Sequence, residues 1–198
     1  MGSLDRRAPT RDSADEDERA LVAAARHDRR AFAPLYARYA NPVFQYCYGR
    51  LGSREEAEDV TSLVFSKALD ALPRFQEGPF RSWLFAIAHN AVIDQVRAKR
   101  HDAPLDAALD VAAAGPSPDE VAADAEAYRR LREFLGHLTN DHRQVIELRL
   151  SGLNGAEIAQ VLGRSHAWVR VNQFRAAARL RVLMGAGTAG EEASHGAR

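Results

Sequence analysis

The sequence has one cysteine, no net charge and no long apolar run, and each of these absences excludes a class of protein. Its 198 residues include a single Cys47, so an internal disulfide is excluded and we expect this thiol in the core. No apolar run could span a bilayer and no signal-peptide-like segment is present, which predicts a cytoplasmic chain with no membrane partner. The 27 basic and 27 acidic residues cancel, so the chain differs from proteins that hold DNA by bulk charge.

Motifs for catalysis and for metal binding are absent as well. The chain has no HExxH pair, no glycine-rich phosphate loop and no nucleophile elbow. An acidic run at Glu55, Glu56, Glu58 and Asp59 is typical of a solvated helix start, where carboxylates favour the positive end of the helix dipole. We therefore expect no enzyme activity, no metal and no cofactor.

The patterns that are present are helical, without strand-like alternation, and they fall into two blocks. They predict an all-α protein with two small helical domains, over residues 18–101 and 120–184, each with its own core. Residues 1–17 are charged and poor in large apolar side chains, which predicts a disordered arm. Residues 102–119 contain three prolines and four aspartates, which predicts a flexible acidic linker, and 185–198 should form a flexible tail.

Prolines and capping residues predict the helix boundaries of the first domain. Pro34 should kink or shorten a helix over 29–39, and Asn41 with Pro42 should start a new helix that stops at Gly52. Ser53 and Glu56 match a capping box for the following helix.

The stretch that follows, FQEGPFRSWLFAIAHNAVIDQVRAKR over residues 75–100, predicts a glycine-proline turn with aromatic flanks and then a helix with a basic end. One face should pack on a core through Leu84, Ile87, Ala88 and Ala91. A second face carries Trp83, Asn90, Asp94 and Arg97, which can stack on or hydrogen-bond unpaired bases. An ordinary amphipathic helix with a half-buried Trp83 is the alternative. His89 should either contact a phosphate or lie on the surface.

A second pattern, GAEIAQVLGRSHAWVRVNQFRAAARLR over residues 155–181, predicts a helix-turn-helix. Gly163 supplies the turn and Ser165 caps the second helix, while the inward positions are Ile158, Ala159, Leu162 and Val169. The second helix or its entry is lined by arginines, as a recognition helix in a DNA major groove requires: Arg164, Arg170, Arg175 and Arg179. An ordinary helical hairpin with a solvated arginine face is the alternative.

Together, and in this order, the two patterns resemble the extracytoplasmic-function (ECF) type of bacterial RNA polymerase sigma factor. The similar segments are residues 31–100 and LGHLTNDHRQVIELRLSGLNGAEIAQVLGRSHAWVRVNQFRAAARLR, residues 135–181. The resemblance implies a promoter-melting and −10-binding first domain, a −35-binding second domain, and two partners, promoter DNA and core RNA polymerase through its largest-subunit clamp helices and its flap. The linker would thread toward the active-site cleft and RNA exit path.

The resemblance also implies which residues meet each partner. Those expected to contact the −10 strand are Phe75, Gly78, Phe80, Trp83, Asn90, Asp94, Arg97 and Arg100. Those expected at the −35 element are Arg164, Ser165, His166, Arg170, Val171, Phe174 and Arg175. The expected clamp contacts are Asp59, Ser62 and Leu63.

Two departures from the family pattern matter. Ser62 and Leu63 stand where the family commonly carries a glutamine and a glutamate, so the clamp-facing surface has less negative charge, which a phosphate on Thr61 or Ser62 would restore. His166 and Trp168 replace small or acidic residues, which leaves the −35 preference open. The first departure makes a regulatory kinase a further candidate partner, and the resemblance to the family makes an anti-sigma factor another. A stand-alone helix-turn-helix regulator, or a polymerase accessory protein, is the alternative function.

Overall fold

The computed structural model describes the backbone of residues 11–76, 78–102 and 131–195, and the side chains of 16–76, 78–99 and 131–184. The regular structure in these ranges is entirely helical, which confirms the expected all-α fold. It divides in sequence into a first module, residues 11–102, and a second module, residues 131–195.

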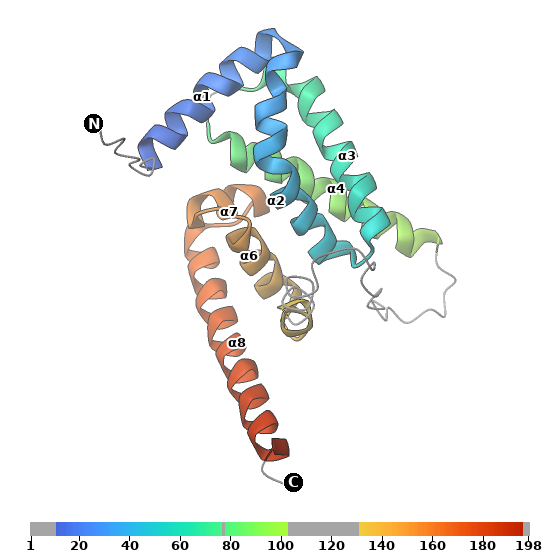
Figure 1. Ribbon diagram of the computed structural model, residues 1–198, viewed down its shortest axis with the longest axis vertical. Coiled ribbons are helices and arrows are strands. Elements are labelled where there is room, and N and C mark those ends of the chain that lie inside the picture. Colours follow the sequence, from blue (N-terminus) through green and yellow to red (C-terminus); the bar gives the residue numbers. More distant parts are fainter. Residues whose placement is uncertain (1–10, 77, 103–130, 196–198) are drawn as a thin grey trace, which may run out of the picture.

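The first module is a bundle of four α-helices with two short 3-10 turns (Figure 1). In chain order these are α1 (Arg11–His27), η1 (Arg29–Phe32), α2 (Ala33–Leu51), α3 (Arg54–Ala71), η2 (Leu72–Arg74) and α4 (Phe80–Asp102). Helix α2 packs against both α3 and α4, so the core lies between these three. Ser53 caps α3 by accepting from the Glu56 amide at 3.5 Å.

Two boundaries of the first module differ from the expectation. Helix α1 already begins at Arg11, so part of the arm expected to be disordered is helical, while residues 1–10 lie outside the described part. Helix α2 runs through Asn41 and Pro42 without a break, so the predicted new helix at that point is wrong. Tyr39 and Val43, which flank this dipeptide, are buried, and their packing outweighs the hydrogen bond that Pro42 cannot donate.

The second module contains a helical segment over 131–136, then α6 (Asn140–Leu150), α7 (Gly155–Leu162) and α8 (His166–His195). Helix α8 extends away from the first module (Figure 1). The expected tail from Gly185 is helical as far as His195, because extending an existing helix is easier than nucleating one. The expected linker lies outside the described residues, apart from Asp102 at the end of α4.

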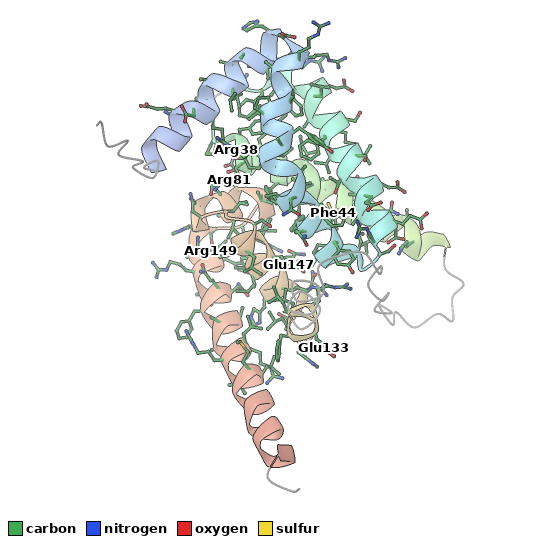
Figure 2. The ribbon with its side chains drawn as sticks, in the orientation of Figure 1. Arg38, Phe44, Arg81, Glu133, Glu147 and Arg149 are labelled. Atoms are coloured by element: carbon green, nitrogen blue, oxygen red, sulfur yellow. The ribbon has the colours of Figure 1, made fainter. Side chains whose placement is uncertain are left out.

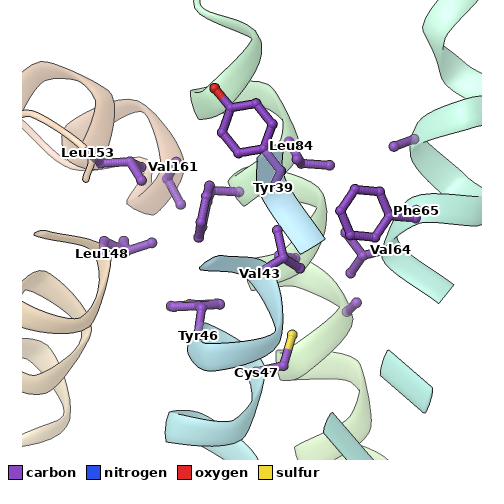
Figure 3. Close-up of a cluster of buried hydrophobic side chains, with 14 of the residues drawn as sticks. Tyr39, Val43, Tyr46, Cys47, Val64, Phe65, Leu84, Leu148, Leu153 and Val161 are labelled. Atoms are coloured by element: carbon purple, nitrogen blue, oxygen red, sulfur yellow. The ribbon is translucent and has the colours of Figure 1, made fainter. Parts of the chain in front are cut away.

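The two helical domains expected from the sequence are present, but their cores are not fully separate, because buried side chains of both modules form one continuous hydrophobic cluster (Figure 3). From the second module the cluster includes Val145, Leu148, Leu153, Ile158, Val161 and Val169. A smaller second cluster lies within the second module, around Leu135, Leu138 and Ala176.

Candidate nucleic-acid interface

The turn before α4 is built around Gly78. Its φ of 149° is one that L side chains rarely adopt, and a Cβ here would meet nothing within 4 Å. The glycine is therefore required by backbone conformation and not by crowding. Pro79 follows, and its carbonyl accepts from the Trp83 amide at 3.3 Å, which starts the helix.

Four aromatic rings gather where this turn meets α2. The ring centroids of Phe75 and Trp83 are 4.9 Å apart, those of Phe80 and Trp83 5.5 Å, and those of Tyr39 and Phe80 5.6 Å. Phe80 is only 2% exposed, so it anchors the turn from within and has no surface to offer DNA in this conformation. Phe75 and Trp83 are half-buried and keep part of each ring open to a base.

Asn90, Asp94 and Arg97 are exposed on α4, as the helical spacing predicts. The opposite face is buried through Leu84, Ala88 and Ala91, with Ile87 half-buried against the same core. Arg100 lies in α4, but its side chain falls outside the described part of the structure. At this basic end, Lys99 pairs with Glu56 of α3 at 2.5 Å, so one of the cations is already engaged.

His89 does not lie on the surface, so both expectations for it are wrong. It is 8% exposed, and its Nδ1 is 2.8 Å from the hydroxyl of the buried Tyr46. Burial, aided by the nearby charge of Arg50, lowers the pKa of His89 to about 4. The imidazole is therefore neutral at physiological pH and has a structural role.

Arg81 lies in the first turn of α4 and was not among the residues expected from sequence. Figure 2 shows Arg81 near the second module. Its guanidinium lies 5.9 Å from the centroid of the Tyr39 ring and donates at 2.9 Å to the Gly152 carbonyl of the second module. The helix dipole disfavours a cation at a helix N-terminus. The position of Arg81 in the first turn was therefore a signal in the sequence that this arginine has specific partners.

The helix-turn-helix has the expected construction. Gly163 adopts a left-handed φ of 61° at the end of α7, and the Ser165 hydroxyl accepts from the Trp168 amide at 3.1 Å. Ile158 and Val169 are fully buried where α7 and α8 meet, while Ala159 and Leu162 are half-buried against the same cluster. A capping box of Asn154 and Glu157 also fixes the start of α7, a signal that the sequence prediction missed.

The outer face of α8 combines cations with exposed apolar side chains. Phe174 is 72% exposed and Val171 47%, which is costly in water and typical of a contact surface. The remaining residues expected at the −35 element are exposed too: Arg164, Ser165, His166, Arg170 and Arg175. The Arg164 guanidinium lies 5.4 Å from the centroid of the half-buried Trp168 ring, which holds it at the entry of the helix.

On α3, Asp59, Ser62 and Leu63 are exposed, with Leu63 45% open to solvent. The Ser62 hydroxyl donates to the Glu58 carbonyl at 2.9 Å. Thr61 is buried, so a kinase could not reach its hydroxyl in this conformation. Of the two expected phosphate acceptors, only Ser62 is accessible.

Two further classes of site are absent from the described residues. No three His, Cys, Asp or Glu side chains among them are placed to hold a metal ion. None of their helices combines the length and apolar character needed to cross a membrane.

Comparison with known proteins assigns each module to a family. Residues 35–101 match the model of sigma-70 region 2, and residues 128–180 match that of sigma-70 region 4. SigD of Mycobacterium tuberculosis, an ECF RNA polymerase sigma factor, is 33% identical over 172 residues, which cover 82% of this chain and 81% of SigD. The chain belongs to the ECF family of RNA polymerase sigma factors. The expected family is thereby confirmed, and with it a role in promoter recognition alongside RNA polymerase.

Other relatives agree with the family. BldN of Streptomyces coelicolor, another ECF sigma factor, is 31% identical over 159 residues, and this match covers 78% of this sigma factor but only 60% of BldN. The solved structure of CnrH in complex with the cytosolic domain of CnrY has a TM-score of 0.66 and 31% identity, covering 85% of this chain and 97% of CnrH. Both modules therefore have counterparts in known sigma factors.

Proposed function

We propose that this sigma factor divides promoter recognition between its two modules, with α4 and its preceding turn acting on the melted −10 strand and α8 reading the −35 duplex. One observation carries this division: a single chain presents an aromatic turn beside the exposed Asn90 and Asp94, and, separately, a recognition helix with an exposed arginine and apolar face. We infer that this role involves no catalytic step and that the chain acts in the cytoplasm, together with RNA polymerase.

At the −10 element, the half-buried rings of Phe75 and Trp83 form a platform on which an extruded base can stack. Asn90 and Asp94 project from the same helix and can hydrogen-bond base edges, while Arg97 neutralises a phosphate. Phe80 acts indirectly, because its buried ring holds the other two in place.

At the −35 element, Arg170 and Arg175 are able to form paired hydrogen bonds with guanine in the major groove. Phe174 and Val171 lie close to them on α8 and fit the methyl group of thymine. Arg164 and Ser165, at the helix entry, are suited to phosphate contacts, and His166 lies beside them.

The exposed part of α3 is the proposed clamp contact. Asp59 supplies the negative charge, and Leu63 offers an apolar contact in place of the family's usual acidic residue. The second module would meet the polymerase flap. A phosphate on Ser62 would strengthen the clamp contact by adding about −1.5 to −2 charges. Since CnrH was solved with CnrY bound, an inhibitory protein partner is proposed for this chain as well.

Run-off transcription with purified core polymerase on genomic promoter fragments tests the proposal. We expect transcripts only when the sigma factor is added. Gel shifts at near-physiological salt, with and without core, test the stand-alone regulator: with no net charge, the free chain should bind promoter duplex weakly. Tight, specific binding by the free chain without any transcription would favour the regulator.

A further inference from the structure

Helix α1 carries none of the residues proposed above to contact DNA or the polymerase, yet one of its carboxylates lies on its inward face. Glu18, Leu21, Val22 and Ala25 share this face at helical spacing, and α1 packs through it on α2, η2 and α4. Asp17 is exposed, whereas the side chain of Glu18 is only 13% exposed. A carboxylate among apolar side chains needs polar partners.

The main partner of Glu18 is Tyr39 in α2. The Tyr39 hydroxyl donates to Oε2 of Glu18, and the guanidinium of the adjacent Arg38 lies 3.6 Å from the same oxygen. Tyr39 is only 3% exposed. Its burial, followed by the hydrogen bond and the charge of Glu18, raises the pKa of the phenol, so the hydroxyl stays protonated and keeps donating.

The ring of Tyr39 supports the turn that precedes α4. Phe80 packs on it with the ring centroids 5.6 Å apart, and the Phe80 centroid lies 5.5 Å from that of Trp83 and 6.0 Å from that of Phe75. A shift of one close-packed ring moves its neighbours, because a protein interior has little free space to absorb it. Contacts therefore run without a gap from Glu18 to the two half-buried rings of the proposed base platform.

A charge from α4 acts on the same hydroxyl. Arg81 directly follows Phe80, its guanidinium lies 5.9 Å from the centroid of the Tyr39 ring, and its charge acts on the Tyr39 hydroxyl along with that of Glu18. The carboxylate of α1 and the first turn of α4 are thus joined through one phenol. Without the carboxylate, the hydroxyl would lose its acceptor and Tyr39 its tie to α1.

We propose that Glu18 is a positioning residue for base capture at the −10 element, acting through Tyr39 on the aromatic rings of the turn. Glu18 itself touches no DNA. Its carboxylate fixes the phenol, and the phenol fixes Phe80 and the platform that receives the base. The role in promoter opening rests on the proposed function of the turn, whereas the effect of Glu18 on the platform is measurable without DNA.

The first test follows Trp83 in the free, full-length protein. With 5-fluorotryptophan incorporated, the two tryptophans of the chain give two fluorine-19 resonances, which Trp168→Phe assigns. Glu18→Ala should shift or broaden the Trp83 resonance and leave that of Trp168 unchanged. Glu18→Gln keeps an oxygen that can accept from Tyr39, so it should restore the resonance. An unchanged Trp83 resonance in Glu18→Ala would refute the positioning role.

The second test measures strand opening with core polymerase on a promoter that the unmodified chain transcribes. Glu18→Ala should spare closed-complex binding in gel shifts and lower the permanganate reactivity of −10 thymines about three- to tenfold. A hydrogen bond to a charged group is worth a factor of about ten or more, and only part of it reaches the turn. Tyr39→Phe should have the same effect, and the double variant should be no worse than either single one, because both remove the same bond.

Val22→Ala is the matched control. It truncates a buried side chain on the same face of α1 and leaves Glu18 and Tyr39 intact. Thermal melts should show a loss of stability comparable to that of Glu18→Ala, with normal opening and an unchanged Trp83 resonance. If Val22→Ala impaired opening as much as Glu18→Ala does, the defect would come from weaker packing of α1 in general, and the positioning role would be wrong.

The positioning role and the proposed function fail in different ways. If Glu18→Ala disturbs the Trp83 resonance but a Trp83→Ala protein opens the promoter normally, the turn does not capture a base, and the proposed −10 function is wrong together with the part that Glu18 plays in it. If Trp83→Ala impairs opening and Glu18→Ala does not, the −10 function stands and the positioning role of Glu18 is refuted.

Discussion

The hydroxyl of Tyr46 in α2 and Nδ1 of His89 in α4 lie 2.8 Å apart in the core of the first module, although the two residues are 43 positions apart in the chain. Both groups are buried, and each satisfies the other's hydrogen-bonding requirement. Burial raises the pKa of Tyr46 and lowers that of His89 to about 4, so the pair stays neutral over the physiological range.

This pair predicts acid sensitivity. Between pH 6.5 and about 4, His89 takes up a proton in the unfolded chain but not in the folded one, so stability falls as the pH is lowered. The loss across this window should be about 3 kcal/mol, and it should fade out as the pH rises above 6.5. Urea unfolding at a series of pH values measures it.

The control for this prediction is His89→Asn, which keeps a polar atom near Tyr46 but cannot titrate. Burial raises the pKa of Glu147, which acts with the opposite sign, so the informative quantity is the difference between the two proteins at each pH. If that difference does not change between pH 7 and pH 4, His89 is not the group responsible.

Arg175→Ala should weaken closed-complex binding by about 1 to 3 kcal/mol if Arg175 reads a base. Its side chain is exposed on the outer face of α8, so the folded structure should not suffer. Arg175→Lys is the matched variant: it keeps the charge but loses the paired hydrogen bonds, so it should restore phosphate attraction without restoring sequence preference. Equal binding by all three proteins in gel shifts with core polymerase would exclude a base contact.

Trp83→Ala should act at a different step. Loss of a stacking surface worth about 1 to 3 kcal/mol per base should impair strand opening, measured by permanganate reactivity, and spare closed-complex binding. Trp83→Phe, which retains an aromatic face, should recover much of the opening. A Trp83→Ala protein that loses duplex binding and opens normally once bound would contradict the division between the modules.

Acidic substitutions on α3 distinguish residues that contact the polymerase clamp from residues buried in the hydrophobic core. Ser62→Glu should raise affinity for core polymerase, and Leu63→Glu should do so if the family's usual acidic contact is available. Thr61→Glu should instead destabilise the fold, by about 1 to 3 kcal/mol or more, because it places a carboxylate at a buried position. Binding assays with core polymerase measure the change in affinity, and thermal melts measure the change in stability. Tight core binding by the unmodified chain, with no gain from Ser62→Glu, would exclude a phosphate switch.

Much of the local construction follows from the sequence. The turn at Gly163, the cap at Ser165 and the inward positions Ile158 and Val169 were all predicted correctly. Each depends on residues a few positions apart, where backbone conformation and helical spacing leave little freedom. The burial of Cys47 and the exposure of Asn90, Asp94 and Arg97 follow for the same reason.

The failures share one cause, which is contact between residues distant in the chain. Pro42 was expected to start a helix, but α2 continues through it because Tyr39 and Val43 are both held in the core. His89 was placed on the polar side of its helix, yet Tyr46 gives it a buried partner. Phe80 was expected to touch DNA, and packing against Tyr39, Phe75 and Trp83 turns it inward.

By itself, the sequence predicted an all-α chain with a glycine-proline turn that leads into a helix with a basic end, followed by a helix-turn-helix, and these patterns together resembled an ECF sigma factor. Those features are encoded in short stretches, so periodicity, caps and glycines specify them locally. Only the tertiary structure decided that the modules share one core and that Glu147 is buried between Arg143 of its own helix and Arg50 of the other module. No local pattern encodes such a contact, because its energy depends on which distant surfaces exclude water together.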